Sequence, residues 1–187
     1  MKPSAKRAHL PRLPPEFYRG MAVIHWVMAV DDRQTGWLTP AFHAQCREAL
    51  LHTMVRCSLL NPVYCLMPDH AHFVWMGIED SADLMLAAGF FRRQTNILLA
   101  PFHWQREAYD HVLRASERKG DAFCDACGYV LEHPVRKQLC VTWQDYPYSG
   151  AILPGYPDVD PRRSDFWDVF WKIYGRRALK PAECQSK

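Results

Sequence analysis

The segment VYCLMPDHAHFVWMG, residues 63–77, decides the fold. Both of its halves are apolar and rich in β-branched and aromatic residues, which is typical of strands. The short polar break Pro68-Asp69 lies between them and suits either a hairpin or one long bent strand. We therefore expect this segment to supply a central pair of adjacent strands, or one bent strand in their place.

Strand and helix signals alternate outward from this segment. Thr39 followed by Pro40 is a strong helix start, because Thr is a good N-cap and Pro suits the first helical position. Pro101 and Pro134 are expected to end two later helices. The other predicted elements are a strand over residues 20–30, a helix from Pro40, a helix over 81–99, a partly extended stretch over 102–114 and a helix from Ser116 to about His133.

This order of elements predicts an α+β protein of the ferredoxin-like kind. Such a sandwich has an antiparallel sheet with helices packed on one face. Residues 1–17 are Pro-rich and basic, and we expect them to form an extended N-terminal arm. Residues 18–150 are predicted to form one domain, followed by a C-terminal extension, 151–187, with a short amphipathic helix over 164–175.

Composition sets broad limits on the class of protein. The 187 residues are 49% hydrophobic, which suits one compact domain with a real core. The formal net charge of +3 is compatible with nucleic acid binding but does not demonstrate it. We find no secretory h-region and no apolar run long enough to span a membrane. The seven cysteines are therefore expected to be reduced thiols of a cytosolic protein.

His70 and His72 are the first candidates for chemistry. Alternate residues of a strand point to the same face, so the two imidazoles lie side by side. Such a pair can bind a metal ion. The spacing alone is equally open to two hydrogen-bonded polar residues at a strand end, and it favours that plainer interpretation.

Tyr129 and His133 form the second candidate pair. They are four residues apart in a predicted helix and therefore share a face. If that face packs against the strand of His70 and His72, three imidazoles and a phenol converge on one point. The alternative is a core tyrosine beside a histidine at the end of a helix. Tyr109 is the second choice for a nucleophilic tyrosine.

Four motifs in order resemble a known family. YCLMPDHAHFVW (64–75) resembles the HUH motif of the single-tyrosine transposases related to the IS200/IS605 group. FHWQREAYDHVLR (102–114), GYVLEHPVRKQL (128–139) and DYPYSG (145–150) are similar to the pattern of one branch, the REP-associated tyrosine transposases. The resemblance covers residues 22–150, which is most of the chain.

The resemblance implies roles for individual residues. It places metal ligands at His70 and His72, the nucleophile at Tyr129 and a third ligand at His133, where the family commonly has Asn or Gln. It implies a divalent metal, Mg or Mn, and three imidazoles make Zn possible as well. Asp69 stands where Asn is usual.

The resemblance also implies a function. It predicts a bacterial, cytoplasmic, metal-dependent endonuclease and strand transferase that acts on single-stranded hairpin (REP-like) DNA through a covalent 5′-phosphotyrosine. Alternatives are a transposase of its own insertion sequence and a catalytically silent hairpin-binding protein. The chain is expected to be a monomer or a homodimer, with no membrane partner.

Two further sets of residues are weaker candidates. Basic side chains expected to contact DNA phosphates are Arg92, Arg93, Arg114 and Arg136. Cys124 and Cys127 form a C-x-x-C pair that permits a zinc-stabilised RNA-binding domain as a third interpretation. A second close pair at zinc-finger spacing is missing, so we favour small core residues there.

Overall fold

The computed structural model describes residues 12–113 and 122–178 of the chain. Within these ranges, five strands form one sheet in the order β4-β1-β3-β2-β5, and every neighbouring pair is antiparallel. The strands are β1 (Val23–Ala29), β2 (Leu59–Met67), β3 (His70–Gly77), β4 (Tyr109–Leu113) and β5 (Ser149–Ile152). β3 therefore lies in the middle of the sheet, with hydrogen-bonded neighbours on both sides.

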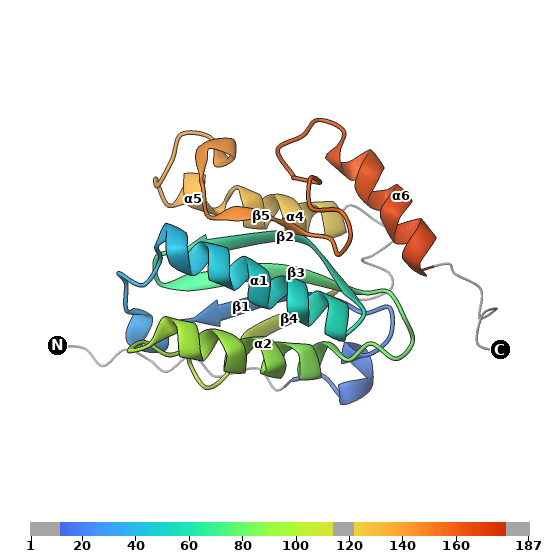
Figure 1. The fold of residues 1–187 in the computed structure, drawn as a ribbon, viewed down its shortest axis with the longest axis horizontal. Coiled ribbons are helices and arrows are strands. Elements are labelled where there is room, and N and C mark those ends of the chain that lie inside the picture. The colour runs from blue at the N-terminus through green and yellow to red at the C-terminus, as the bar shows by residue number, and fades with distance from the viewer. Residues whose placement is uncertain (1–11, 114–121, 179–187) are drawn as a thin grey trace.

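Helices cover the sheet, and the two longest pack against each other on one face (Figure 1). These are α1 (Pro40–Arg56) and α2 (Leu84–Leu99). The other described helices are α4 (Ala122–Leu131), α5 (His133–Arg136), α6 (Phe166–Ala178) and the short 3-10 turns η1 (Pro15–Tyr18), η2 (Asp31–Arg33) and η3 (Trp143–Asp145). None of the helices within the described ranges is long and apolar enough to cross a membrane.

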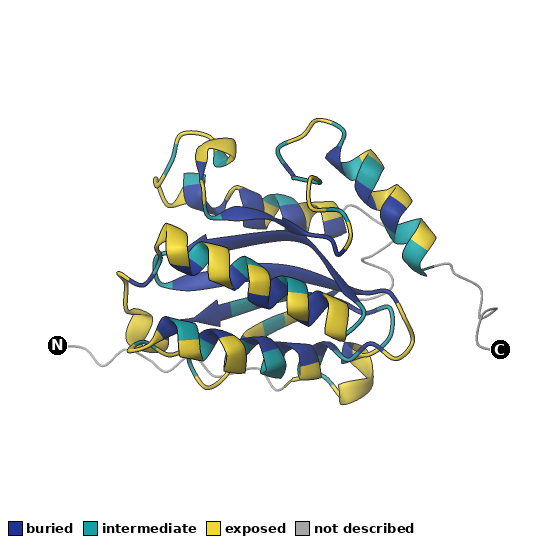
Figure 2. Ribbon diagram, in the orientation of Figure 1, coloured by how far each residue is buried: buried dark blue, intermediate teal, exposed yellow. Residues whose placement is uncertain are grey.

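Each face of the sheet has its own apolar core, because side chains alternate along the strands. Ala71, Phe73 and Trp75 of β3 pack with α1 and α2, whereas Val74 and Met76 pack with α4 and α6. Figure 2 shows the central strands buried between these two layers, whereas β4 at the edge is partly exposed. The predicted ferredoxin-like sheet with helices on one face is confirmed, and α4 covers the opposite face beside β2 and β3.

Several sequence predictions are confirmed in detail. β2 and β3 pair as a hairpin across Pro68-Asp69, which excludes the single bent strand. Thr39 caps α1, since its Oγ1 accepts a hydrogen bond from the Phe42 amide at 3.1 Å. The second helix begins three residues later than predicted, because its cap is Asp83, which accepts from the Leu86 amide.

The third predicted helix ends differently from our expectation. α4 stops at Leu131, and Pro134 lies in the first turn of α5 rather than after the last turn of a helix. A proline is tolerated in a first turn because its missing amide hydrogen would have no partner there. The predicted start of this helix at Ser116 lies outside the described residues. The two helices are thus separated only at Glu132, and His133 is the first residue of α5.

The C-terminal part holds a strand that the sequence analysis missed. β5 pairs with β2 at the edge of the sheet, so the predicted domain boundary after residue 150 falls inside a strand. The predicted amphipathic helix is present as α6 and extends to Ala178. At the other end of the chain, Pro15–Tyr18 of the predicted arm form η1, and residues 1–11 lie outside the description.

Candidate active site

β3 presents His70 and His72 on the face of the sheet that α4 covers. His72 lies between Val27 of β1 and Cys65 of β2, and His70 is two pairs further along the same ladder. Both are almost fully buried, at 7% and 3% exposure. Their Nε2 atoms lie 2.9 Å apart, so the two rings meet edge to face at one point.

α4 and α5 bring Tyr129 and His133 to the same point. The ring of His133 lies 4.5 Å from that of His72 and 5.2 Å from that of His70, centre to centre. One nitrogen from each of the three histidines falls within 4.8 Å of the others. The Tyr129 ring lies 5.9 Å from the His72 ring and 5.6 Å from the His133 ring. The structure therefore gathers the four residues named from the sequence.

The Nε2 atom of His133 is buried and has no hydrogen-bond partner among the described residues. Leaving such an atom unpaired costs about 1–3 kcal/mol, so a buried unpaired nitrogen calls for an explanation. A metal ion held by Nε2 of His70, His72 and His133 would supply the missing partner. Three neutral imidazoles suit Zn²⁺ and Mn²⁺, and they are unusual ligands for Mg²⁺. These residues can therefore hold a divalent metal.

An acidic side chain supports His70 from behind. The Nδ1 of His70 donates to Oδ1 of Asp69 at 2.5 Å, and the other carboxylate oxygen pairs with Arg33 at 3.2 Å. Burial raises the pKa of Asp69, but the hydrogen bonds from His70 and Arg33 outweigh it and lower that pKa below its ordinary value. Asp69 is therefore ionised at neutral pH and keeps Nε2 of His70 free to face the site.

A fourth histidine, His25 of β1, lies behind His72. Its Nε2 is 3.0 Å from Nδ1 of His72, and the two rings stack at 5.2 Å. This residue was not predicted from the sequence. Its signal was a histidine within the predicted strand 20–30, but that strand alone does not tell which residue of a neighbouring strand it faces.

Arg136 of α5 contacts both Tyr129 of α4 and His133 of α5. Its Nη2 donates to the carbonyl of Tyr129 at 2.5 Å and to Nδ1 of His133 at 3.2 Å. The guanidinium carbon also lies 3.9 Å from the centre of the Tyr129 ring, a cation–π contact. Arg136 therefore holds the tyrosine side chain against the site from the solvent side.

The four histidines at the site are neutral at pH 7. Burial, aided by nearby positive groups, lowers the pKa of His133 to about 4 and that of His25 to about 4. Burial likewise lowers the pKa of His72, and it lowers that of His70 against the opposing effect of Asp69. Neutral imidazoles, and not imidazolium ions, are the form that binds metal ions.

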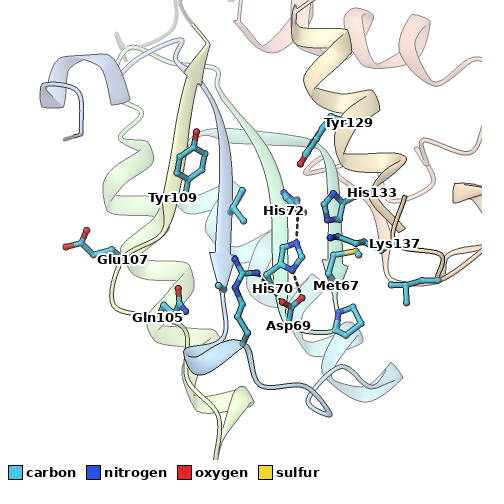
Figure 3. A pocket seen from close by; sticks show the side chains of 15 residues that line it. Met67, Asp69, His70, His72, Gln105, Glu107, Tyr109, Tyr129, His133 and Lys137 are labelled. Carbon is cyan, nitrogen blue, oxygen red and sulfur yellow. Dashed lines mark hydrogen bonds and ion pairs between the residues drawn. The ribbon is translucent and has the colours of Figure 1, made fainter. Parts of the chain in front are cut away.

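An open cleft of about 980 Å³ lies over the histidines. Figure 3 shows Tyr129 on one side of it and Tyr109 of β4 on the other, with His70 and His72 between them. The two tyrosines are 45% and 52% exposed. Arg33 and Lys137 add positive charge to the lining, and Glu107 adds negative charge. The cleft can thus admit an anionic chain to the buried imidazoles.

The described arginines among those predicted to contact DNA phosphates do not all lie together in the structure. Arg136 lies at the site, as described. Arg92 of α2 donates to the carbonyls of Gln105 and Arg106, so it supports the loop that leads into the cleft wall. Arg93 is exposed on α2, which packs on the far face of the sheet. Arg114 lies outside the described residues.

The cysteine pair takes no part in the site. Both cysteines belong to α4: Cys127 is buried on the side that faces the core, and Cys124 is exposed. Among the described residues, His70, His72 and His133 form the one group of three or more side chains with the spacing of metal ligands. The interpretation of a zinc-stabilised domain built on these cysteines finds no support here.

Comparison with known proteins bears on the fold. No protein-family model matches the chain, and no curated protein matches it. Among solved structures, it is similar to a REP-associated tyrosine transposase bound to a REP hairpin, with a TM-score of 0.64 at 15% identity, over 96% of this chain and 92% of that chain. The two proteins share a fold over nearly their whole length. The known structure is a member of the family that the sequence motifs resemble.

Proposed function

We propose that this protein is a metal-dependent endonuclease and strand transferase for single-stranded hairpin DNA, with Tyr129 as its nucleophile. One observation carries the proposal: three buried imidazoles converge beside a half-exposed tyrosine in an open cleft. A structure of the same fold holds a REP hairpin, which supports DNA of that kind as the substrate class.

The histidines define where the reacting phosphate binds. His70, His72 and His133 would hold a Mn²⁺, Mg²⁺ or Zn²⁺ ion, which supplies Lewis-acid stabilisation of the phosphate charge and of the leaving oxygen. Arg33 and Lys137 line the same cleft and attract neighbouring phosphates. Three histidines in place of a ligand set with an amide favour Mn²⁺ or Zn²⁺ over Mg²⁺.

Tyr129 performs the covalent step. Its phenol oxygen attacks the phosphorus, a bond from tyrosine to the 5′ phosphate forms, and the bond to the 3′ oxygen breaks. The phenol proton passes to solvent, which reaches this half-exposed side chain, and the leaving 3′ oxygen takes up a proton. The phosphotyrosine conserves the energy of the broken phosphodiester. A second 3′ hydroxyl can then attack it, which rejoins DNA and frees the tyrosine.

Arg136 prepares the nucleophile for this step. A free phenol has a pKa of about 10 and is a weak nucleophile at neutral pH. A guanidinium over the ring and on the backbone carbonyl of Tyr129 stabilises negative charge that develops on the phenol oxygen. The same contacts hold the Tyr129 side chain beside His72 and His133.

The test is a covalent adduct. Purified protein is mixed with single-stranded hairpin oligonucleotides taken from repeated palindromes around its own gene, with MnCl₂ or MgCl₂ present. We expect a protein–DNA band that resists denaturation. It should be lost in Tyr129→Phe and in His70→Ala and retained in Tyr109→Phe, the matched tyrosine across the cleft.

Each alternative has its own outcome in this assay. An adduct that survives Tyr129→Phe but not Tyr109→Phe would move the nucleophile to β4. Tight hairpin binding without an adduct from any variant would favour the silent hairpin-binding protein. The buried, unpaired Nε2 of His133 supports the metal on which the catalytic proposal depends.

A further inference from the structure

His25 contacts the candidate metal site without being one of its three ligands. It comes from β1, where it lies opposite Val74 of β3 and on the same face as His72. Its Nε2 meets Nδ1 of His72 at 3.0 Å, and the other ring nitrogen of His72, Nε2, is the one that meets His70. His25 therefore acts on the site through His72.

The position of one proton decides what this contact does. A neutral imidazole carries a single N–H, and a metal binds the other nitrogen. If Nε2 of His72 binds a metal, the proton of His72 must be on Nδ1. That N–H then requires an acceptor, and the lone pair of Nε2 of His25 lies where the acceptor is needed.

The arrangement parallels the support of His70. Asp69 accepts from Nδ1 of His70 at 2.5 Å, as a carboxylate behind a metal-binding histidine does. His25 occupies the equivalent place behind His72, with a neutral nitrogen instead of a carboxylate. Two of the three candidate ligands are thus held by acceptors on the side away from the metal.

We propose that His25 is a positioning residue that places the proton of His72 on Nδ1 and so directs Nε2 of His72 to the metal. The inference rests on the metal-dependent function proposed above. His25 also touches Tyr129 edge to face, with ring centres 5.9 Å apart. One side chain therefore orients a ligand and contacts the nucleophile.

Metal affinity without DNA tests this role. Metal-free wild-type protein and the variants His25→Gln, His25→Phe and His111→Phe are titrated with MnCl₂ and with ZnCl₂. His111 of β4 lies opposite His25 in the sheet and is exposed, so it controls for the loss of a histidine beside the site. Phenylalanine keeps the ring against Tyr129, and the glutamine side-chain oxygen can accept the hydrogen bond.

We expect His25→Phe to weaken metal binding by roughly 10- to 100-fold, the usual effect of losing such a supporting partner. His25→Gln should restore affinity to within about threefold of wild type, since its amide oxygen can accept from Nδ1 of His72. His111→Phe should bind like wild type. Equal affinity for His25→Phe and wild type, or an equal loss in His111→Phe, would overturn the proposal.

Nitrogen NMR of the His72 ring supplies a readout that a general packing defect does not move. In Zn²⁺-loaded wild type we expect the proton on Nδ1 of His72; a proton on Nε2 would contradict the inference even if His25→Phe failed to fold. Wild-type protein that binds neither metal would refute the proposed function instead. The two failures are therefore distinguishable.

Discussion

Arg136 donates a hydrogen bond to Nδ1 of His133 at 3.2 Å. A guanidinium can only donate, so Nδ1 accepts and the proton of a neutral His133 is on Nε2, the nitrogen that faces the site. Metal binding through that nitrogen requires the opposite arrangement. Among the three candidate ligands, His133 thus has a donor behind it where His70 has an acceptor. Arg136 must release Nδ1 before His133 binds a metal.

The first prediction concerns Arg136→Gln. The substitution removes a positive charge and a donor to His133, and its amide oxygen can accept from Nδ1. We expect metal affinity to rise by about tenfold, which corresponds to about 1.4 kcal/mol. Adduct formation at saturating metal should fall, because Tyr129 loses its guanidinium. Titration with ZnCl₂ and the adduct assay measure the two opposite effects.

Lys137→Gln is the matched control for this prediction. It removes a positive charge at the next residue, which lines the cleft. If it raises metal affinity as much as Arg136→Gln does, charge alone accounts for the effect and the argument from the hydrogen bond is wrong.

The second prediction concerns pH. His25 has a pKa of about 4 in the folded protein, below the ordinary 6.5, chiefly because it is buried. As the pH falls from 6.5 towards 4, the unfolded chain takes up a proton at this residue that the folded chain does not. The free energy of unfolding of the metal-free protein therefore decreases over this window, by about 2 kcal/mol between pH 7 and pH 5 from this residue.

Urea unfolding at pH 7, 6 and 5 checks the pH prediction. His25→Gln should lose less stability than wild type over that range, because it lacks the titrating group. His52→Gln, which removes an exposed histidine of α1, should follow wild type. Parallel curves for wild type and His25→Gln would show that the buried His25 does not cause the acid sensitivity.

Local signals explain what the sequence predicted of the fold. The cap at Thr39 and the two-residue break at Pro68-Asp69 lie within the elements that they define, so α1 and the β2–β3 hairpin were readable. β5 was not, because it pairs with β2 over separations of 84 to 91 residues (Cys65 with Ser149, Asn61 with Ile152) and sits in a Pro- and Gly-rich stretch. The helix end predicted at Pro134 was wrong although its signal is local, because a proline suits the first turn of a helix as well as the position after its last turn.

The same division holds for the site. Spacing placed His70 with His72 and Tyr129 with His133, since each pair lies within one strand or one helical stretch. That the two pairs meet depends on Cys127 and Val130 of α4, which pack on the sheet face of Val74. His25 required the register of β1 against β3, which no single segment encodes. Arg136 was named for a phosphate, yet its contacts are with Tyr129 and His133.

The third prediction compares two changes at Asp69. Asp69→Asn keeps an oxygen that accepts from Nδ1 of His70, so metal affinity should stay within about threefold of wild type. Asp69→Leu removes the acceptor and should weaken metal binding by roughly 10- to 100-fold. Titration with MnCl₂ measures both. Arg33→Leu breaks the ion pair with Asp69 but leaves the hydrogen bond to His70, and it should have little effect.

Failure of this comparison has a clear form. If Arg33→Leu lowers metal affinity as far as Asp69→Leu, the ion pair and not the hydrogen bond to His70 supports the site. If both changes at Asp69 are without effect, His70 needs no acceptor behind it.

The fourth prediction concerns Tyr109, the exposed ring across the cleft from Tyr129. Single-stranded nucleic acids stack bases on such rings, and each stacked base contributes about 1–3 kcal/mol. In a Tyr129→Phe background that cannot form the adduct, Tyr109→Ala should weaken binding of the single-stranded flank of a hairpin by roughly 5- to 150-fold, whereas Tyr109→Phe should bind normally. Fluorescence anisotropy of a labelled oligonucleotide measures both affinities.

Trp171→Ala is the comparison for Tyr109→Ala, since Trp171 is 43% exposed on α6 and does not line the cleft. It should leave DNA affinity unchanged, because stacking requires a ring beside the path of the strand. An equal loss in Trp171→Ala would mean that DNA covers α6 as well. A loss in Tyr109→Phe as large as that in Tyr109→Ala would mean that the hydroxyl of Tyr109, and not its ring face, contacts DNA.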